Sequence, residues 1–80
     1  MSKARDVVEV IARTLASRPN EVEVTETERR GQAVVELTMA PGDLGRVIGR
    51  QGRTATALRT LAAAAGELDG KRTVVDFRDE

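Results

Sequence analysis

The sequence has 80 residues, and its 13 basic and 13 acidic side chains cancel to a formal net charge of zero. It contains neither cysteine nor histidine, which excludes disulfides, thiolate or imidazole metal sites, and the commonest catalytic nucleophile and general base. No signal peptide is recognisable, and no apolar run approaches the roughly 20 residues that a membrane-spanning helix needs. We therefore expect a cytoplasmic protein of one domain, residues 1–80, without a cofactor, a metal or a membrane partner.

The first half of the chain predicts a helix and a hairpin. Apolar residues recur at helical spacing from about residue 3 to 17, which indicates an amphipathic helix that ends before Pro19. Val22 and Val24 alternate with polar residues and predict a strand. A polar turn at residues 28–32 leads into a second strand, and the two should pair as an antiparallel hairpin. The apolar face of the second strand consists of Ala33, Val35, Leu37 and Met39.

The second half predicts two consecutive helices and a last strand. The first helix is short and should be N-capped by Asp43. The second should run from about residue 53 to 65 with Gly66 as its C-cap, and residues 72–77 should form a strand. A connection through helices should place this last strand parallel to the second one. The predicted fold class is α+β, in the order α-β-β-α-α-β, with three helices on one face of a three-stranded mixed sheet.

The link Gly49-Arg50-Gln51-Gly52 between the two helices is short enough to form a tight turn. Glycine at both ends tolerates unusual backbone angles and allows another backbone to approach closely. The turn leads into a helix N-terminus, where N–H groups and the helix dipole favour an anion. Because Arg46, Arg50 and Arg53 surround this point, the sequence predicts a phosphate site there.

Charge is distributed unevenly along the chain. Residues 44–61 carry four arginines and no acid, whereas residues 21–36 carry five glutamates and two arginines. A local basic patch can bind phosphate although the total charge is zero. The alternative is that these arginines form an ordinary solvated helix face.

The segment from Val47 to Gly52, followed by apolar residues at positions 55 and 58, resembles the signature of a KH domain. In that module a GXXG loop clamps about four nucleotides of single-stranded RNA. The longer run from Gly42 to Leu61 resembles the KhpA family of small bacterial KH proteins. The loop and this resemblance together predict the RNA-binding residues Arg46, Val47, Ile48, Gly49, Arg50, Gln51, Gly52 and Arg53.

The resemblance also implies a type II KH fold and a role as RNA chaperone or post-transcriptional regulator. It further implies a link to cell elongation, and hence to cell shape and the regulation of the cell envelope and cell wall. Two positions depart from the KH pattern. Position 55 is Ala where many KH domains carry a bulky aliphatic residue, and Phe77 is the single aromatic residue, so stacking platforms for bases are absent. In the family, bases lie in an apolar groove between the helix pair and the last strand, where Val47 and Ile48 belong either to the groove floor or to the core.

A second apolar row on the long helix consists of Ala57, Leu61 and Ala64. Alanine is a good helix former, so the row is either helix filler or a contact surface for another helix. The resemblance implies a homodimer, or a heterodimer with a larger KH-containing protein. We therefore expect these three residues to form the dimer or partner interface.

Two other function classes compete with RNA binding. One is a protein-interaction subunit that uses the long helix and has little RNA binding of its own. The other is an enzyme acting on a small phosphorylated substrate, but the glycines fit neither the dinucleotide fingerprint nor the P-loop, and no nucleophile–base pair is present. We therefore expect no enzymatic activity and no small-molecule substrate.

Overall fold

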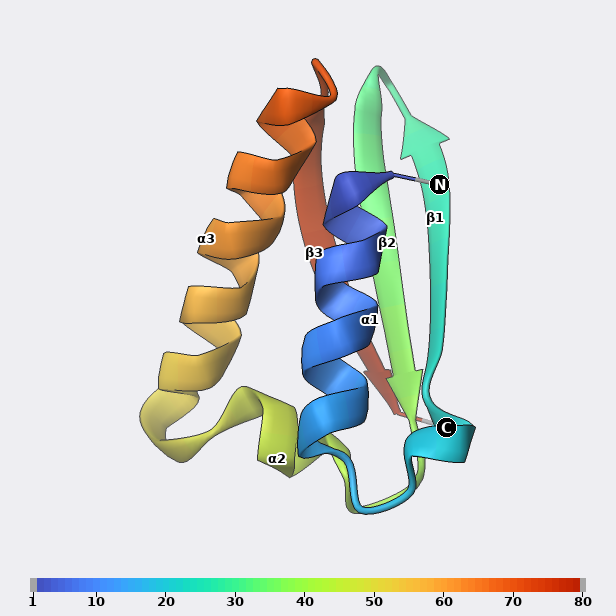
Figure 1. Cartoon of the computed structure of the whole chain (residues 1–80), viewed down its shortest axis with the longest axis vertical. Coiled ribbons are helices and arrows are strands. Elements are labelled where there is room, and N and C mark those ends of the chain that lie inside the picture. Colours follow the sequence, from blue (N-terminus) through green and yellow to red (C-terminus); the bar gives the residue numbers. More distant parts are fainter. Residues whose placement is uncertain (1, 80) are drawn as a thin grey trace.

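The helices and strands follow one another in the order that the sequence predicts (Figure 1). The computed structural model describes residues 2–79. The elements are α1 (Lys3–Leu15), the 3-10 turn η1 (Pro19–Glu21), β1 (Glu23–Arg29), β2 (Gln32–Met39), α2 (Leu44–Ile48), the 3-10 turn η2 (Arg50–Gly52), α3 (Arg53–Leu68) and β3 (Arg72–Asp79). The predicted α+β order α-β-β-α-α-β is confirmed.

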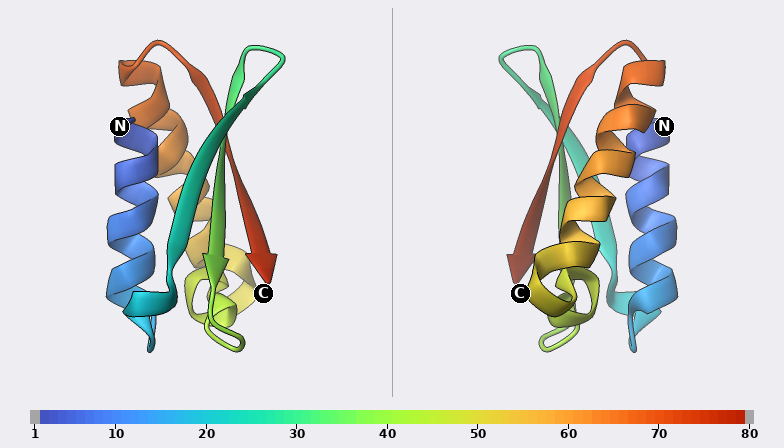
Figure 2. Two further views of the ribbon diagram at one scale, coloured as in Figure 1. Left: turned by 90° about the vertical axis from the view of Figure 1, so that its right-hand side faces the viewer. Right: turned by 90° about the vertical axis from the view of Figure 1, so that its left-hand side faces the viewer.

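The sheet has the strand order β1-β2-β3. Strand β2 pairs antiparallel with β1, where Leu37 lies opposite Val24, and parallel with β3, where Leu37 lies opposite Phe77. The predicted mixed sheet is therefore confirmed. Helices α1 and α3 lie side by side over one face, α2 sits beside the end of β2, and the strands twist strongly (Figures 1 and 2).

The core lies between the two long helices and the inward face of β2. Alternate residues of a strand point to the same face, and all four predicted apolar residues of β2 are buried: Ala33, Val35, Leu37 and Met39. From the helix layer, Val8 and Leu58 are buried almost completely. The opposite face of the sheet carries no helix among residues 2–79.

The hairpin turn is tighter than predicted. Strands β1 and β2 extend to Arg29 and Gln32, so only Arg30 and Gly31 connect them, with φ of 53° and 79°. Two positive φ values are the hallmark of the two-residue turn that matches the twist of antiparallel strands.

Helix α1 is also shorter than predicted, because Ala16 already has extended backbone angles.

Gly66 is not the C-cap of α3, contrary to the prediction. The helix continues to Leu68, and Gly66 is buried inside it where α3 passes β3. A Cβ atom at position 66 would clash with Oγ1 of Thr73 and lie 2.8 Å from Cβ of Thr73 and 3.2 Å from the carbonyl oxygen of Lys71. Gly66 therefore permits a close helix–strand contact, and the turn into β3 uses Gly70, whose φ is 72°.

This contact predicts the effect of Gly66→Ala. Alanine is the better helix former by about 1 kcal/mol, but the clash with Thr73 should outweigh this gain and destabilise the protein by about 1–3 kcal/mol. Urea unfolding measures the change. The control is Gly45→Ala in α2, because nothing lies within 4 Å of a Cβ atom there; this variant should be as stable as the wild type or more so. Equal stability of both variants would show that α3 and β3 are farther apart at Gly66.

Candidate nucleic-acid interface

The loop between α2 and α3 has an unusual backbone. Gly49 has φ 75° and ψ 176°, Gln51 has φ 57° and ψ 23°, and Gly52 has φ 72° and ψ 14°. A Cβ atom on Gly49 would also clash with the side chain of Thr54, whereas the space around Gly52 is open. Glycine is thus required at position 49 by both backbone angle and space, and at position 52 by backbone angle alone.

The polar side chains of the loop, Arg50 and Gln51, are exposed. Gln51 Oε1 accepts a hydrogen bond of 2.9 Å from Arg53 Nη2, and Arg46 Nε lies 3.6 Å from Asp43 Oδ1. Within the part of the chain that the structure describes, Arg50 has neither an ion pair nor a side-chain hydrogen bond. Among the predicted residues, Arg50 is therefore the most available for an external anion.

The two apolar residues before the loop have different surroundings. Val47 is completely buried in the core, whereas Ile48 is 36% exposed. Of the two, only Ile48 has a side chain that reaches the surface beside the loop. Val47 instead anchors α2, and through it the loop, to the core.

The second predicted row of α3 is on the surface. Ala57 and Ala64 are exposed, and Leu61 is 51% exposed and so does not belong to the core. The same row continues to Leu68, which lies seven residues beyond Leu61 and is 76% exposed. Val10 on the neighbouring helix α1 is exposed as well.

One contact between α3 and β3 was not predicted from the sequence. The guanidinium carbon of Arg59 lies 4.7 Å from the centre of the Phe77 ring, a distance typical of a cation–π pair. Next to this pair, a hollow of about 380 Å³ is lined by Arg59, Thr60, Ala63, Thr73, Val74 and Val75. The sequence showed Arg59 as part of the basic segment, but only the position of β3 under α3 could pair it with Phe77.

Asp43 precedes α2 as predicted, but its side chain does not cap the helix. Its buried carboxylate accepts hydrogen bonds from the Ser17 hydroxyl at 2.6 Å and from the Arg18 backbone N–H at 3.0 Å. The Ser17 bond is the main cause that holds the pKa of Asp43 below its ordinary value of 3.8; burial opposes it, and the Arg18 bond and Arg46 add to the lowering. Asp43 therefore ties the segment after α1 to the start of α2.

Among the described residues, no three or more Asp, Glu, His or Cys side chains are grouped so that they could hold a metal ion. Within residues 2–79, none of the helices has the length and apolar character needed to cross a membrane.

Comparison with known proteins identifies the family of the chain. Residues 5–77 match the model of the KhpA/KhpB KH-domain family. The chain belongs to this family. The match covers the helix pair, its GXXG loop, β1, β2 and β3 as far as Phe77.

Curated members of the family are similar over nearly their whole length. The RNA-binding protein KhpA of Aquifex aeolicus is 46% identical over 77 residues, which are 96% of this chain and 98% of that protein. KhpA of Mycobacterium bovis is 50% identical over 72 residues, or 89% of each chain. KhpA of Clostridium acetobutylicum is 43% identical over 73 residues, or 91% of this chain and 97% of that protein.

The fold also occurs within larger solved structures. The chain superposes on Aquifex aeolicus Era bound to GDP and aluminium fluoride with a TM-score of 0.63 and 19% identity. A structure of Era with MgGDPNP and nucleotides of 16S ribosomal RNA gives the same values. The superposition covers 95% of this chain but 29% of the Era chain, so the similarity concerns one part of Era and its fold alone.

The bonds of Asp43 predict a pH-dependent effect of Asp43→Asn. A pKa that is lower in the folded state gives stability that is present above the unfolded-state pKa and is lost as the pH falls through the folded-state value. At neutral pH the variant should therefore unfold at lower urea concentration than the wild type, and the two midpoints should converge below pH 3.8, the ordinary pKa. The exposed Asp76 serves as control, since the urea midpoints of Asp76→Asn and the wild type should differ little at every pH. If the midpoints of Asp43→Asn and the wild type differ by the same amount at every pH, the carboxylate charge is excluded as the cause.

Proposed function

We propose that this protein binds single-stranded RNA through the sugar–phosphate backbone at the loop Gly49–Gly52. The observation that carries the proposal is the loop itself, which has positive φ values at three of its four residues. Its Arg50 is exposed and forms no ion pair with any of residues 2–79. The relatives named as RNA-binding proteins support it, because they match this chain over nearly its whole length.

The binding mechanism follows from the surroundings of the loop. Gly49 and Gly52 present backbone without Cβ atoms, so a nucleotide backbone can approach closely. Among residues 2–79 no side chain caps the N-terminus of α3, and this 16-residue helix directs the positive end of its dipole at the loop. Arg46, Arg50 and Arg53 add positive charge around the same point, while Ile48 offers apolar contact.

Contacts to phosphate and sugar position RNA without reading its sequence. A protein that binds in this way suits many RNAs, which is the property expected of an RNA chaperone or post-transcriptional regulator. We further propose that the protein acts in the cytoplasm without catalysing a reaction, and that it is linked to cell elongation and the cell envelope, as the family resemblance implies.

Reversing charge at the loop tip tests the proposal. Arg50→Asp combined with Gln51→Asp should abolish binding to single-stranded RNA, because two anions would face the phosphates and oppose the helix dipole. The fold should survive, since both side chains are exposed and aspartate tolerates the positive φ at position 51. Circular dichroism and fluorescence anisotropy with labelled RNA measure the two effects.

The matched control is Arg18→Asp combined with Asn20→Asp. It makes the same change in net charge at exposed positions near η1, away from the loop, and should retain most of the affinity. If the loop variant binds RNA as well as this control does, the loop is not the binding site.

The exposed row of α3 supports a further proposal about assembly. We propose that Ala57, Leu61 and Ala64 form a self-complementary contact between two copies, in which the small alanines allow the helices to approach and Leu61 projects between them. Leu68 extends this row. Two linked modules would also bind a long RNA more tightly than one.

Leu61→Arg should convert a dimer into a folded monomer. Leu61 is half exposed, so the substitution should leave the core intact, but it places a charge at the centre of the contact. Light scattering at tens of micromolar measures the mass, and Val74→Arg on the opposite face of the sheet is the control. If the wild type is a monomer at this concentration, self-association is ruled out. Light scattering of a mixture with a larger KH-containing protein would then show whether the row binds that partner instead.

A further inference from the structure

The outer face of the sheet, which no helix covers within residues 2–79, has two halves that differ in charge (Figure 2). In the half towards the ends of β2 and β3, the charged side chains pair with one another. Arg78 Nη2 lies 2.7 Å from Glu36 Oε2 and 3.3 Å from Asp76 Oδ2. The Thr25 hydroxyl also donates a hydrogen bond of 3.4 Å to Glu36 Oε1. Both of these carboxylates therefore have partners within the face.

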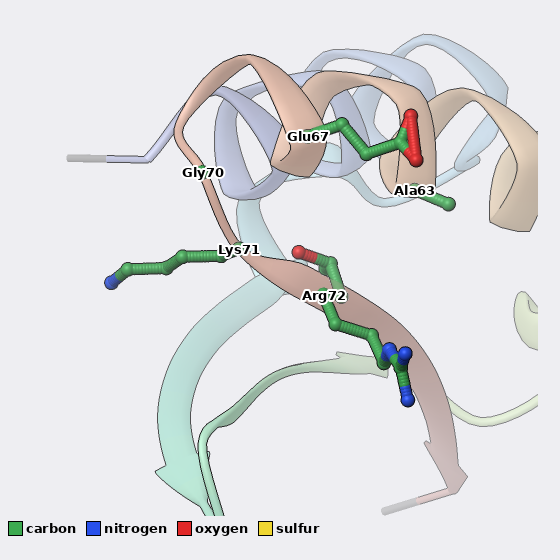
Figure 3. Close-up of a pocket in the computed structure, with 6 residues that line it drawn as sticks. Ala63, Glu67, Gly70, Lys71 and Arg72 are labelled. Atoms are coloured by element: carbon green, nitrogen blue, oxygen red, sulfur yellow. The ribbon is translucent and has the colours of Figure 1, made fainter.

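The half next to the hairpin turn is basic. Arg29, Gln32 and Arg72 lie opposite one another on the three strands. Residues paired across a sheet point to the same face, so all three side chains point outward, away from the helices. Figure 3 agrees, because the Arg72 side chain points away from α3 there. Arg30 follows in the turn, and we call Arg29, Arg30, Gln32 and Arg72 the hairpin patch.

The arginines of the hairpin patch are available to an external anion. Arg30 and Arg72 are exposed, and neither forms an ion pair with any of residues 2–79. Arg29 Nη2 lies 4.0 Å from Glu36 Oε2, an oxygen that Arg78 already contacts at 2.7 Å. Positive charge is therefore in excess at this end of the face. Planar guanidinium groups bind phosphate through two parallel hydrogen bonds, so the patch suits a phosphate better than a simple anion.

Beside the patch lies a hollow of about 530 Å³ with an apolar floor. The floor consists of Val34 and Val74, which are paired neighbours on β2 and β3, and Val74 is 41% exposed. The wall away from the hairpin carries Asp76, whose charge Arg78 offsets. The wall towards the hairpin consists of three patch residues: Arg29, Arg30 and Gln32. An apolar floor beside phosphate-binding groups suits a nucleotide, which has a flat base and an anionic phosphate.

We propose that the hairpin patch and its hollow are a second contact site for single-stranded RNA, in which Arg29 and Arg72 bind phosphates. One base of the strand lies in the hollow, on Val34 and Val74. The inference rests on the proposed RNA binding at the loop, because two phosphate contacts and one base hold RNA only weakly by themselves. A strand already held at the loop reaches the patch at an effective concentration of about millimolar, so a weak second site adds to the affinity.

The distance between the two sites sets the length of RNA that can reach both. The hairpin and the α2–α3 loop lie at opposite ends of the molecule (Figure 1), about 26 Å apart along β2. At about 3.4 Å per nucleotide of a stacked strand, this distance takes about eight nucleotides, in addition to the about four that the loop clamps. About twenty nucleotides therefore reach both sites, with some left to pass around the sheet, whereas four reach the loop alone. A strand bound at both sites is held extended and so is kept from pairing with itself.

Removing the two arginines on the strands tests the second site. Arg29→Gln combined with Arg72→Gln should lower the slope of log K against log salt for a 20-nucleotide oligo(U) by about 1.4, because each phosphate contact on a single strand contributes roughly 0.7. At 0.1 M salt this corresponds to about 25-fold weaker binding. The affinity for a 4-nucleotide oligo(U) should not change. Fluorescence anisotropy over a series of salt concentrations measures both RNAs, and circular dichroism checks the fold.

Two further variants separate charge from apolar contact. The matched control is Arg13→Gln combined with Arg18→Gln, which removes the same charge at two exposed positions outside the hairpin patch and should leave the salt slope unchanged. Val74→Ala removes part of the floor of the hollow. It should weaken binding of the 20-nucleotide RNA a few-fold with the same salt slope as the wild type, because no phosphate contact is lost.

The outcomes distinguish this inference from the proposed function. If the 4-nucleotide RNA binds, but the Arg29 and Arg72 double variant binds the 20-nucleotide RNA as the control does, the hairpin patch does not contact RNA and the loop proposal stands. An acidic protein surface is then the partner that suits its charge. If the slope falls but Val74→Ala binds as the wild type does, the place given to the base is wrong. If the wild type binds neither RNA, the proposed function fails and this inference fails with it.

Discussion

The parallel pairing of β2 with β3 is the constraint on which the arrangement of the site depends. After β2 the chain must return along the whole strand before β3 can begin at the same end of the sheet. The 8 residues of β2 extend over about 26 Å, and the 16 residues of α3 over about 24 Å. Because one helix makes the return, the α2–α3 loop has to lie at the end of the sheet where β2 and β3 finish, outside the core.

The loop is exposed because both of its flanks are anchored. Val47 before the loop and Ala55 and Leu58 after it are buried in the same core. Because both ends of the loop are held by the core, the four residues between α2 and α3 have to form a tight turn. This turn requires the positive φ values of Gly49, Gln51 and Gly52. The same geometry leaves Arg50 without an internal partner among the described residues. The tight turn thus accounts for both the glycines and the free charge that RNA binding would use.

The close contact of α3 with β3 shapes the surface beyond the loop. Gly66 lets the end of the helix approach Thr73, while Arg59 covers Phe77 nearer the loop. Between these two contacts lies the hollow beside Arg59, with Ala63 and Thr73 in its walls. A neutral protein can therefore present both a basic loop and an apolar helix row, because the fold collects each kind of side chain on a different part of the surface.

The element order, the mixed sheet and the position of the loop follow from local patterns in the sequence. Period-2 alternation in β2 and helical spacing in α1 and α3 are local properties, and the glycines at positions 49 and 52 mark a turn whatever surrounds them. Which partner each side chain meets depends instead on how the elements pack. Gly66 after an alanine-rich helix has the pattern of a C-cap, and Asp43 before a short helix has that of an N-cap. Their actual partners, Thr73 and Ser17, are 7 and 26 residues away and come into contact only when the helices pack on the sheet. For the same reason, the burial of Val47, the exposure of Leu61 and the pairing of Arg59 with Phe77 depend on packing that no local pattern contains.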